Sequence, residues 1–263
     1  MLASRLRMIA EYVRERRRYG TPALTGDPGN GTVFLLDGVG GYLLTCLMAR
    51  KAFREAGLSC ATYLFDWHRG PRGEMLGDLV CLRRNQLAAA RLARLIRRFR
   101  RAYPDAPLHI LAYSGGTGIA VFAAERLNER ARIDTLVLCC SALSPEYPLA
   151  RAMQHVDRCY AFVSERDRVM LGIGTRLFGT VDREHCPAAG LTGFRCLRGH
   201  GRSDSSWQAR VQEIRWTADM RADGHYGGHV GTASPTFIAR RIVPLLITPR
   251  HVPSPSATPS SRP

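Results

Sequence analysis

The apolar residues of this chain fall into short continuous runs that alternate with longer stretches of helical spacing. The runs are bounded by Gly, Pro, Asp and Ser, which is typical of fully buried strands. They predict strands over 32–38, 59–67, 107–114, 133–142, 158–167 and 212–217. Helical spacing predicts helices over 41–57, 79–104, 116–130 and 234–247, with one short helix inside 144–156.

This alternation predicts the fold class. Continuous apolar strands need cover on both faces, so we expect an α/β fold with a mostly parallel central sheet and helices on both faces. Only 143–157 separates the fourth strand from the fifth, which leaves no room for a large cap domain. The longer excursion is 168–211. We expect the domain to span 21–247, after a basic helix over 1–20 and before a disordered Pro- and Ser-rich tail over 248–263.

The charge of the chain is strongly positive, at +16 over 263 residues. Lys51 is the single lysine, so an arginine-biased composition explains the charge as readily as a selected basic patch. The densest basic run, 91–103, carries apolar residues at helical spacing, and its arginines then lie on the outward face. We therefore expect no specific nucleic-acid partner, while peripheral contact with an anionic membrane stays open.

The eight cysteines show no pair at zinc-ligand spacing, and several lie in apolar runs. They predict reduced thiols, a cytoplasmic protein and no metal site. No apolar run approaches the length that spans a bilayer, and the first twenty residues lack the apolar core of a signal peptide.

One serine stands at a sharp corner of the predicted sheet. Ser114 ends the third strand, in the stretch LHILAYSGGTGIA, and two glycines lead directly into a helix. Such a corner exposes a hydroxyl at the carboxyl end of a strand, where function gathers in parallel sheets. The helix N-terminus and the N–H of Gly115 would favour negative charge there. A phosphate-binding loop would need a G-K-[ST] ending, which this turn lacks.

The motif AYSGG (112–116) resembles the nucleophile elbow of the α/β-hydrolase family, G-x-S-x-G, with Ala112 in place of the first glycine. The stretch LLDGVGGY (35–42) resembles the oxyanion loop of the family, with Asp37 where a histidine often stands. The resemblance covers roughly 30–247 and implies that Ser114 is a nucleophile.

The same resemblance implies an oxyanion site made of backbone N–H groups. Val39 or Gly40 would supply one donor and Gly115 the other. Tyr113 is expected at this edge, where it would line the substrate pocket, although ordinary packing also explains an aromatic residue at a loop end.

The family places the acid and the histidine after the serine in the chain. Asp167 follows the fifth strand and is the expected acid, with Glu165 and Asp182 as weaker alternatives. The histidine belongs to the loop after the last strand, which offers two. The stretch GGHVG favours His229, and His225 remains an alternative base.

The resemblance implies a serine hydrolase that cleaves a carboxylic ester of a small molecule or lipid, with no cofactor. Thioester cleavage and acyl transfer to an alcohol stay open. A catalytically silent scaffold with this fold is one alternative function, and a basic protein that binds anionic lipid or nucleic acid is another.

Overall fold

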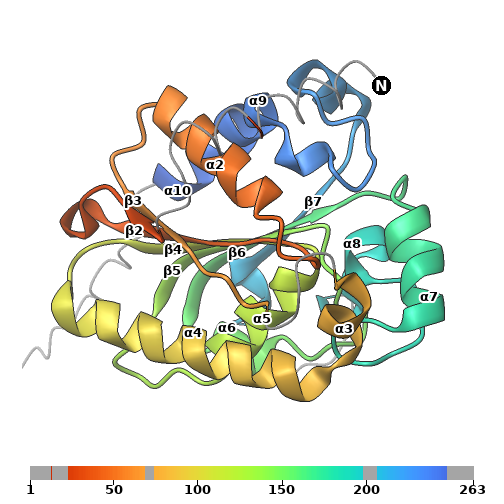
Figure 1. The fold of residues 1–263 in the computed structure, drawn as a ribbon, viewed down its shortest axis with the longest axis horizontal. Helices are drawn as coiled ribbons and strands as arrows, with labels where there is room; N and C mark the ends of the chain where they lie inside the picture. The colour runs from red at the N-terminus through yellow and green to blue at the C-terminus, as the bar shows by residue number, and fades with distance from the viewer. Residues whose placement is uncertain (1–12, 14–22, 69–73, 198–205, 248–263) are drawn as a thin grey trace, which may run out of the picture.

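The computed structural model describes residues 13, 23–68, 74–197 and 206–247. Its centre is a seven-stranded sheet in the order β1-β3-β2-β4-β5-β6-β7 (Figure 1). All neighbouring strands are parallel except β1 and β3, which are antiparallel. The strands are β1 (Leu24–Thr25), β2 (Thr32–Leu36), β3 (Ala61–Leu64), β4 (Leu108–Tyr113), β5 (Ile133–Cys139), β6 (Val156–Val163) and β7 (Val211–Arg215).

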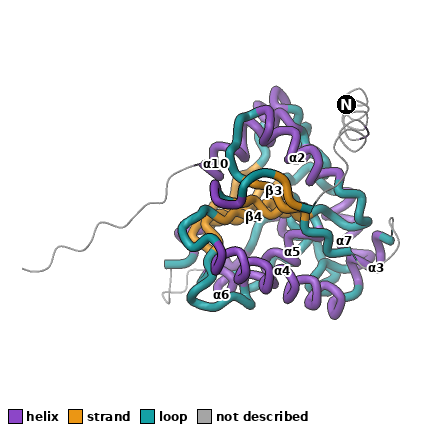
Figure 2. Tube along the Cα trace, turned by 60° about the vertical axis from the view of Figure 1, so that its left-hand side comes forward, coloured by secondary structure: helices purple, strands orange, loops and turns teal. Residues whose placement is uncertain are grey.

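Helices cover both faces of this sheet (Figures 1 and 2). One face carries α2 (Leu44–Glu55), α9 (Pro235–Phe237) and α10 (Val243–Ile247), the last two joined by a π-helical segment. The other face carries α4 (Leu82–Ala102), α5 (Gly115–Ala124) and α6 (Ala150–Met153). Shorter helices lie at the carboxyl edge of the sheet: α3 (Met75–Val80), α7 (Thr175–Phe178) and α8 (Ala189–Thr192).

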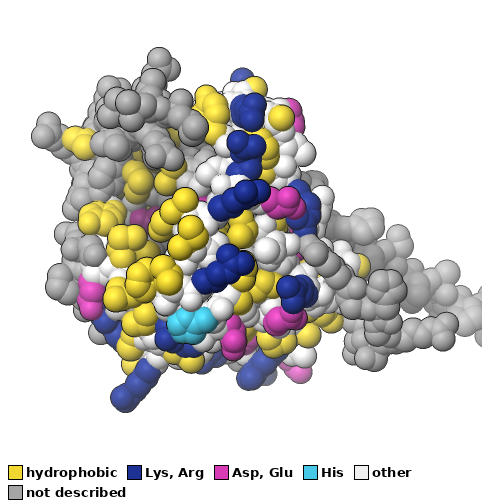
Figure 3. Space-filling view, turned by 90° about the vertical axis from the view of Figure 1, so that its right-hand side faces the viewer, with side chains coloured by type: hydrophobic (Ala, Val, Ile, Leu, Met, Phe, Trp, Pro, Cys, Tyr) yellow, Lys and Arg dark blue, Asp and Glu magenta, His cyan; other side chains and the backbone are white. Residues whose placement is uncertain are grey.

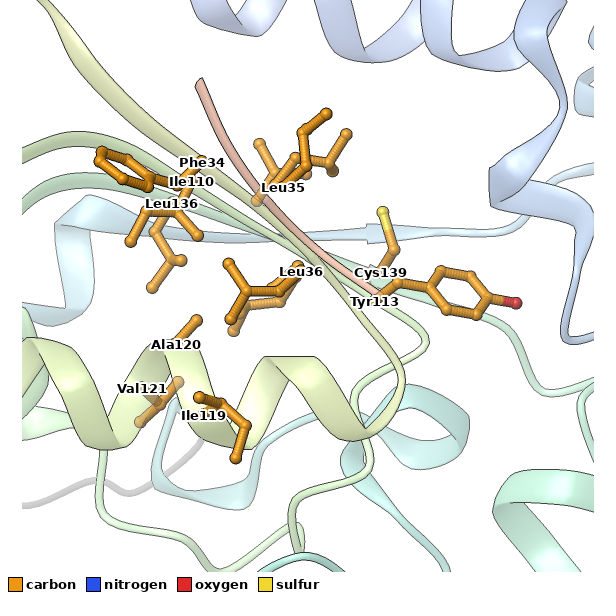
Figure 4. Close-up of a cluster of buried hydrophobic side chains, with 14 of the residues drawn as sticks. Phe34, Leu35, Leu36, Ile110, Tyr113, Ile119, Ala120, Val121, Leu136 and Cys139 are labelled. Carbon is orange, nitrogen blue, oxygen red and sulfur yellow. The ribbon is translucent and has the colours of Figure 1, made fainter. Parts of the chain in front are cut away.

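One part of the core lies between the central strands and α5 (Figure 4), and the same core continues to the buried side of α2 on the other face. Every residue of α5 is buried, which explains why this helix is apolar all round. Leu36 lies between the sheet and the helix, and Ile119 and Val121 extend the same apolar cluster. Tyr113 instead projects past the end of β4, toward the edge where the loops gather.

A buried ion pair fixes the opposite end of β4. Arg100 Nη2 lies 2.6 Å from Asp134 Oδ2, and the same oxygen accepts the N–H of Leu108 at 2.6 Å. Arg100 also donates to the backbone carbonyl of Ala106 at 2.7 Å. The charges are therefore paired and hydrogen-bonded, as burial requires.

The predicted α/β class, the mostly parallel sheet and the absence of a large cap between β5 and β6 agree with this architecture. β1 was not predicted, since no strand was expected before residue 32. The helix expected over 79–104 is interrupted at Cys81, whose backbone (φ −91°, ψ 79°) is not helical and separates α3 from α4. The helix expected over 116–130 ends at Ala124, where tighter turn hydrogen bonds replace the helical pattern.

Apart from Val13, the predicted basic helix over 1–20 lies outside the described residues, as does the predicted tail over 248–263. Within the part of the chain that is described, no helix combines the length and the apolar character needed to cross a membrane.

Candidate active site

Ser114 occupies a strained corner between β4 and α5. Its backbone has φ 50° and ψ −121°, a region that residues with a side chain rarely adopt, and such strain clusters at functional sites. The N–H of Ser114 is held by the carbonyl of Cys139 at 2.9 Å. Gly116 has no room for a side chain, because a Cβ there would collide with the carbonyl oxygen of Asp37. The corner therefore brings the start of α5 against the loop that follows β2.

Three side chains from three loops form one hydrogen-bonded chain at this corner. Ser114 Oγ lies 3.0 Å from His229 Nε2, and His229 Nδ1 lies 2.5 Å from Asp167 Oδ2. Asp167 follows β6 and is buried, with 3% of its surface exposed. A carboxylate accepts only, so Nδ1 carries the proton and Nε2 is free to accept from the serine hydroxyl. The structure thus brings together Ser114, Asp167 and His229, which are the predicted nucleophile, the predicted acid and the preferred histidine.

His225 lies behind the histidine loop. Its Nδ1 accepts the N–H of Gly227 at 3.2 Å, and its ring packs against Phe237 at 4.9 Å between centroids. Burial lowers the pKa of His225 to about 4, so the ring is neutral near neutral pH. Among the described residues it forms no hydrogen bond with Ser114 or Asp167, and the geometry therefore favours His229 over the alternative base.

The two weaker acid candidates also lie elsewhere. Glu165 is exposed and pairs with Arg215 at 3.1 Å. Asp182 accepts the N–H of Ser144 at 2.9 Å and its hydroxyl at 2.5 Å. Neither carboxylate contacts His229, so Asp167 is the acid that the structure brings to the histidine.

The backbone carbonyl of His229 is held from two sides. The hydroxyl of Tyr113 donates to it, and Cys140 Sγ donates to it at 3.3 Å. The ring of Tyr113 also meets the imidazole edge-on, at 5.3 Å between centroids. The hydroxyl of Tyr113 thus anchors the histidine loop, and the prediction that Tyr113 lines the substrate pocket stays a prediction.

Cys140, Asp167 and His229 place three metal-ligating atoms within 4.8 Å of one another. Metal binding by cysteine needs the thiolate. Burial raises the pKa of Cys140 well above its usual range, and the neighbouring Asp167 raises it further. The protonated thiol donates a hydrogen bond to the carbonyl of His229, and Asp167 binds His229 Nδ1.

The predicted oxyanion loop lies against the elbow. A Cβ on Gly115 would stand 2.9 Å from Val39 Cγ1, so the two positions are in direct contact. The N–H of Gly115 is the first of α5 and has no acceptor within the helix. Gly40, the other predicted oxyanion donor of the loop, already donates its N–H to Asp78 Oδ2 at 2.8 Å. Val39 is therefore the better placed of the two candidates in the loop.

Asp37 does not face the serine. Its carboxylate accepts the hydroxyl of Thr45 and, at 3.3 Å, the N–H of Thr45 near the start of α2. Burial raises the pKa of Asp37, while these hydrogen bonds oppose the rise. Asp37 thus joins the oxyanion loop to the helix that follows it.

Sequence reasoning gave His68 no functional placement, but the structure places it beneath the oxyanion loop. His68 Nε2 lies 2.9 Å from the carbonyl oxygen of Gly38 and 3.3 Å from Asp78 Oδ2, while Nδ1 lies 3.0 Å from Asp66 Oδ1. Its ring stacks on Trp67. The stretch DWHRG after β3 was a weak signal for this role, since it stands at the carboxyl end of a strand.

Trp67 supports the same loop from the other side. Its indole N–H donates to the carbonyl of Asp37 at 2.9 Å, and its ring lies close to Gly115. The backbone of the oxyanion loop is therefore held by side chains from the β3 loop and from α3. Sequence spacing alone gives no sign of this contact, because about thirty residues separate the partners.

The comparisons with known proteins agree with this geometry. Residues 83–174 match the family described as "T6SS Tle3 phospholipase effector domain". The match includes Ser114 and Asp167, whereas the oxyanion loop and His229 lie outside it. No curated protein is similar enough to the chain to count as a match.

Several solved structures resemble the chain. Esterase PE8 is 13% identical with a TM-score of 0.47, over 85% of this chain and 97% of its own. Carboxylesterase CesB from Bacillus subtilis is 10% identical with a TM-score of 0.45, over 93% and 99%. Cutinase from Trichoderma reesei, solved with a phosphonate inhibitor, is 18% identical with a TM-score of 0.40, over 59% and 72%. These identities are too low to carry a substrate or mechanism to this chain.

The order of the sheet and the elbow at the end of β4 are features of the α/β-hydrolase fold. The phospholipase effector family adds a match across the central third of the chain. The chain has the α/β-hydrolase fold.

Proposed function

We propose that this protein is a serine hydrolase that cleaves a carboxylic ester bond of a phospholipid. The hydrogen-bonded chain from Ser114 through His229 to Asp167 carries the proposal. It has the order and roles of a nucleophile, a base and a carboxylate that orients the base. The match of residues 83–174 to a phospholipase effector family supports the lipid substrate.

In this mechanism Ser114 Oγ attacks the ester carbonyl carbon while His229 Nε2 takes the serine proton. The tetrahedral intermediate collapses, the ester C–O bond breaks, and His229 returns the proton to the leaving alcohol, a lysophospholipid. Water then attacks the acyl-serine with His229 again as base, which releases a fatty acid and restores Ser114. Asp167 holds one tautomer and stabilises the imidazolium that forms in each step.

The N–H groups of Gly115 and Val39 hold the oxyanion in this proposal. Both belong to backbone that packing keeps in place: Gly115 begins a fully buried helix, and Val39 lies against it. Donors fixed before the reaction stabilise developing charge without reorganisation, and the loss of one typically slows such a reaction about 100- to 1000-fold.

The first experiment is labelling with a fluorophosphonate probe, followed by digestion of vesicles of mixed-acyl phosphatidylethanolamine and phosphatidylglycerol. We expect labelling of the unaltered protein and of the Asp182→Asn variant. We expect none for Ser114→Ala and a large loss for Asp167→Asn. Mass spectrometry should detect free fatty acid and lysophospholipid.

Two outcomes would contradict the proposal. Diacylglycerol with a released phosphorylated headgroup would mean phosphodiester rather than carboxylic ester cleavage. A folded protein that neither reacts with the probe nor releases fatty acid would favour the catalytically silent scaffold.

The cellular location remains a proposal as well. All eight cysteines are free, which suits the reducing cytoplasm in which such a protein is made. The family that matches residues 83–174 is described as an effector of a secretion system, so delivery to another compartment fits the same proposal.

A further inference from the structure

A helical segment with an apolar outer face begins directly after Asp167. A π-helical segment, Val169–Gly174, runs without a break into α7. Its inner side is buried at Leu171 and Thr175. Its outer side exposes large apolar residues, with 70% of Val169, 56% of Ile173, 65% of Leu177 and 47% of Phe178 accessible. Surface helices normally turn charged and polar residues to solvent, so this face is unusual.

A second element extends the apolar surface. Met75 and Leu76 of α3 are exposed, and α3 contacts α7. We call these six residues the apolar rim: Met75, Leu76, Val169, Ile173, Leu177 and Phe178. The face of the molecule turned to the viewer in Figure 3 carries a broad hydrophobic patch, with basic side chains beside it.

The apolar rim is continuous with the candidate active site. The N–H of Leu171 donates to the carbonyl of Asp167 at 3.2 Å, which ties the first turn of the segment to the acid. On the other side, a Cβ on Gly40 would stand 3.2 Å from Met75 Cγ, so α3 touches the oxyanion loop. A flat ligand that covered the rim would therefore lie beside the loops that carry Asp167 and the proposed oxyanion donors.

The charges on the same segment favour an anionic ligand. Arg168 and Arg176 have no carboxylate within 4 Å among the described residues. Together with Ile173 they line an open hollow of about 790 Å³. Arg215 also lines it but is already paired with Glu165 at 3.1 Å. Exposed apolar side chains next to unpaired guanidinium groups match the acyl and phosphate layers of a membrane surface.

We propose that the apolar rim, with Arg168 and Arg176, docks the protein on an anionic phospholipid bilayer and so presents Ser114 to its lipid substrate. This inference rests on the proposed function, since docking would serve lipid hydrolysis. Its test does not depend on that function, because vesicle binding can be measured without catalysis. The apolar residues enter the boundary between headgroups and acyl chains, and the two arginines bind lipid phosphates.

Sedimentation with vesicles tests the proposal. The full chain carrying Ser114→Ala is mixed with phosphatidylcholine vesicles or with vesicles that also contain phosphatidylglycerol. We expect binding to the anionic vesicles. The double variant Ile173→Asp with Leu177→Asp should bind at least about tenfold more weakly. The matched control is Leu87→Asp on α4, an apolar residue that is 56% exposed and is not part of the apolar rim, and it should bind as the parent does.

Substitution of Arg168 and Arg176 gives a second variant, in which the apolar side chains of the rim are unchanged. Arg168→Gln with Arg176→Gln should weaken binding to anionic vesicles on the order of thirtyfold and leave binding to phosphatidylcholine unchanged. Thermal unfolding and gel filtration of each variant ensure that a loss of binding is not a loss of fold.

Several results would overturn the docking proposal. They are absence of vesicle binding by the parent, equal binding by the Ile173→Asp/Leu177→Asp variant, or an equal loss in the Leu87→Asp control. A parent that is dimeric in solution, with a monomeric rim variant, would assign the rim to a second copy of the chain instead. Vesicle binding without any hydrolysis by the unaltered protein would contradict the proposed function alone. Ester hydrolysis without vesicle binding would contradict the docking alone.

Discussion

The carboxylate of Asp78 and the backbone N–H of Gly40 form a buried hydrogen bond of 2.8 Å that joins α3 to the loop after β2. Burial raises the pKa of Asp78, and this hydrogen bond opposes the rise. The contact fixes the backbone next to Val39, the proposed oxyanion donor. Asp78 therefore acts on the proposed chemistry through the loop rather than by touching the ester.

We predict that Asp78→Ala lowers kcat roughly tenfold to a hundredfold, with a smaller change in KM. The reason is that a buried hydrogen bond whose acceptor is lost costs about 1–3 kcal/mol. Asp78→Asn keeps an acceptor oxygen and should recover most of the rate. Steady-state kinetics with a soluble ester measures both. Equal rates for Asp78→Ala and the unaltered protein would mean that the loop holds its position without this contact.

His68 should make stability depend on pH. Burial opposes its charged form, but the hydrogen bond with Asp66, the charge of Asp78 and the carbonyl of Gly38 outweigh burial and raise the pKa of His68. Both ring nitrogens face acceptors, so only the imidazolium satisfies both sides.

Because the pKa of His68 is raised in the folded state, its stabilising contribution is complete below the ordinary histidine pKa of about 6.5 and is lost as pH rises through the raised value. We predict that His68→Gln is less stable than the unaltered protein in mild acid, and that the gap narrows in alkali. Urea unfolding across this range measures the gap. A gap that widens with rising pH would contradict the assigned charge state.

His225 should have the opposite dependence. Its folded pKa of about 4 lies below the ordinary value, so the unfolded chain binds more protons between about pH 6.5 and pH 4. Acidification through this window should lower the free energy of unfolding by up to about 3 kcal/mol. The free energy of unfolding of the His225→Gln variant should not show this part of the dependence on pH. The same variant should still react with the fluorophosphonate probe, whereas His229→Gln should not. The reverse pattern of labelling would make His225 the base.

Tyr113 positions the histidine loop through its hydroxyl. Tyr113→Phe keeps the ring and removes the hydrogen bond to the carbonyl of His229, which leaves Cys140 as the remaining side-chain donor to that oxygen. We predict about a fivefold fall in kcat, corresponding to about 1 kcal/mol for one hydrogen bond. A change confined to KM would instead support the original prediction that Tyr113 lines the substrate pocket.

The ion pair between Arg100 and Asp134 should matter for stability and not for chemistry. Asp134→Ala leaves a buried guanidinium without its carboxylate, which typically costs about 3–5 kcal/mol. Urea unfolding should show this loss, while the fraction that remains folded should label with the probe at the normal rate. The exposed pair of Arg195 and Glu146 is the matched control, and Glu146→Ala should change stability little.

Much of the fold was predictable from the sequence because buried parallel strands are continuous apolar runs. β4 and β5 are buried at every position, and their runs were recognised directly. β1 was missed because two exposed residues within a turn-rich stretch carry no such pattern. Cys81 breaks a helix that helical spacing would have continued, and the separate helix α3 then brings Asp78 to the N–H of Gly40 in the oxyanion loop.

The candidate site also has residues that the sequence predicted and residues that it did not. Ser114, Asp167 and His229 each stand in a loop that follows a strand. Their order along the chain and the resemblance of their motifs to those of the family were enough to nominate them, while His225 stayed open as an alternative base. The choice between Val39 and Gly40 depended on a hydrogen bond from a helix about forty residues away. His68 was passed over because nothing in its own neighbourhood shows that both ring nitrogens meet acceptors.

The contact of Gly116 with the carbonyl of Asp37 has a consequence for how this corner can vary among related sequences. On the strand side, Ala112 shows that a methyl group fits where the familiar motif has glycine, since it is fully buried without displacing the turn. On the helix side there is no such freedom, because any side chain would push the oxyanion loop away from the serine. A search for distant relatives should therefore relax the first glycine of the motif and keep the last one fixed.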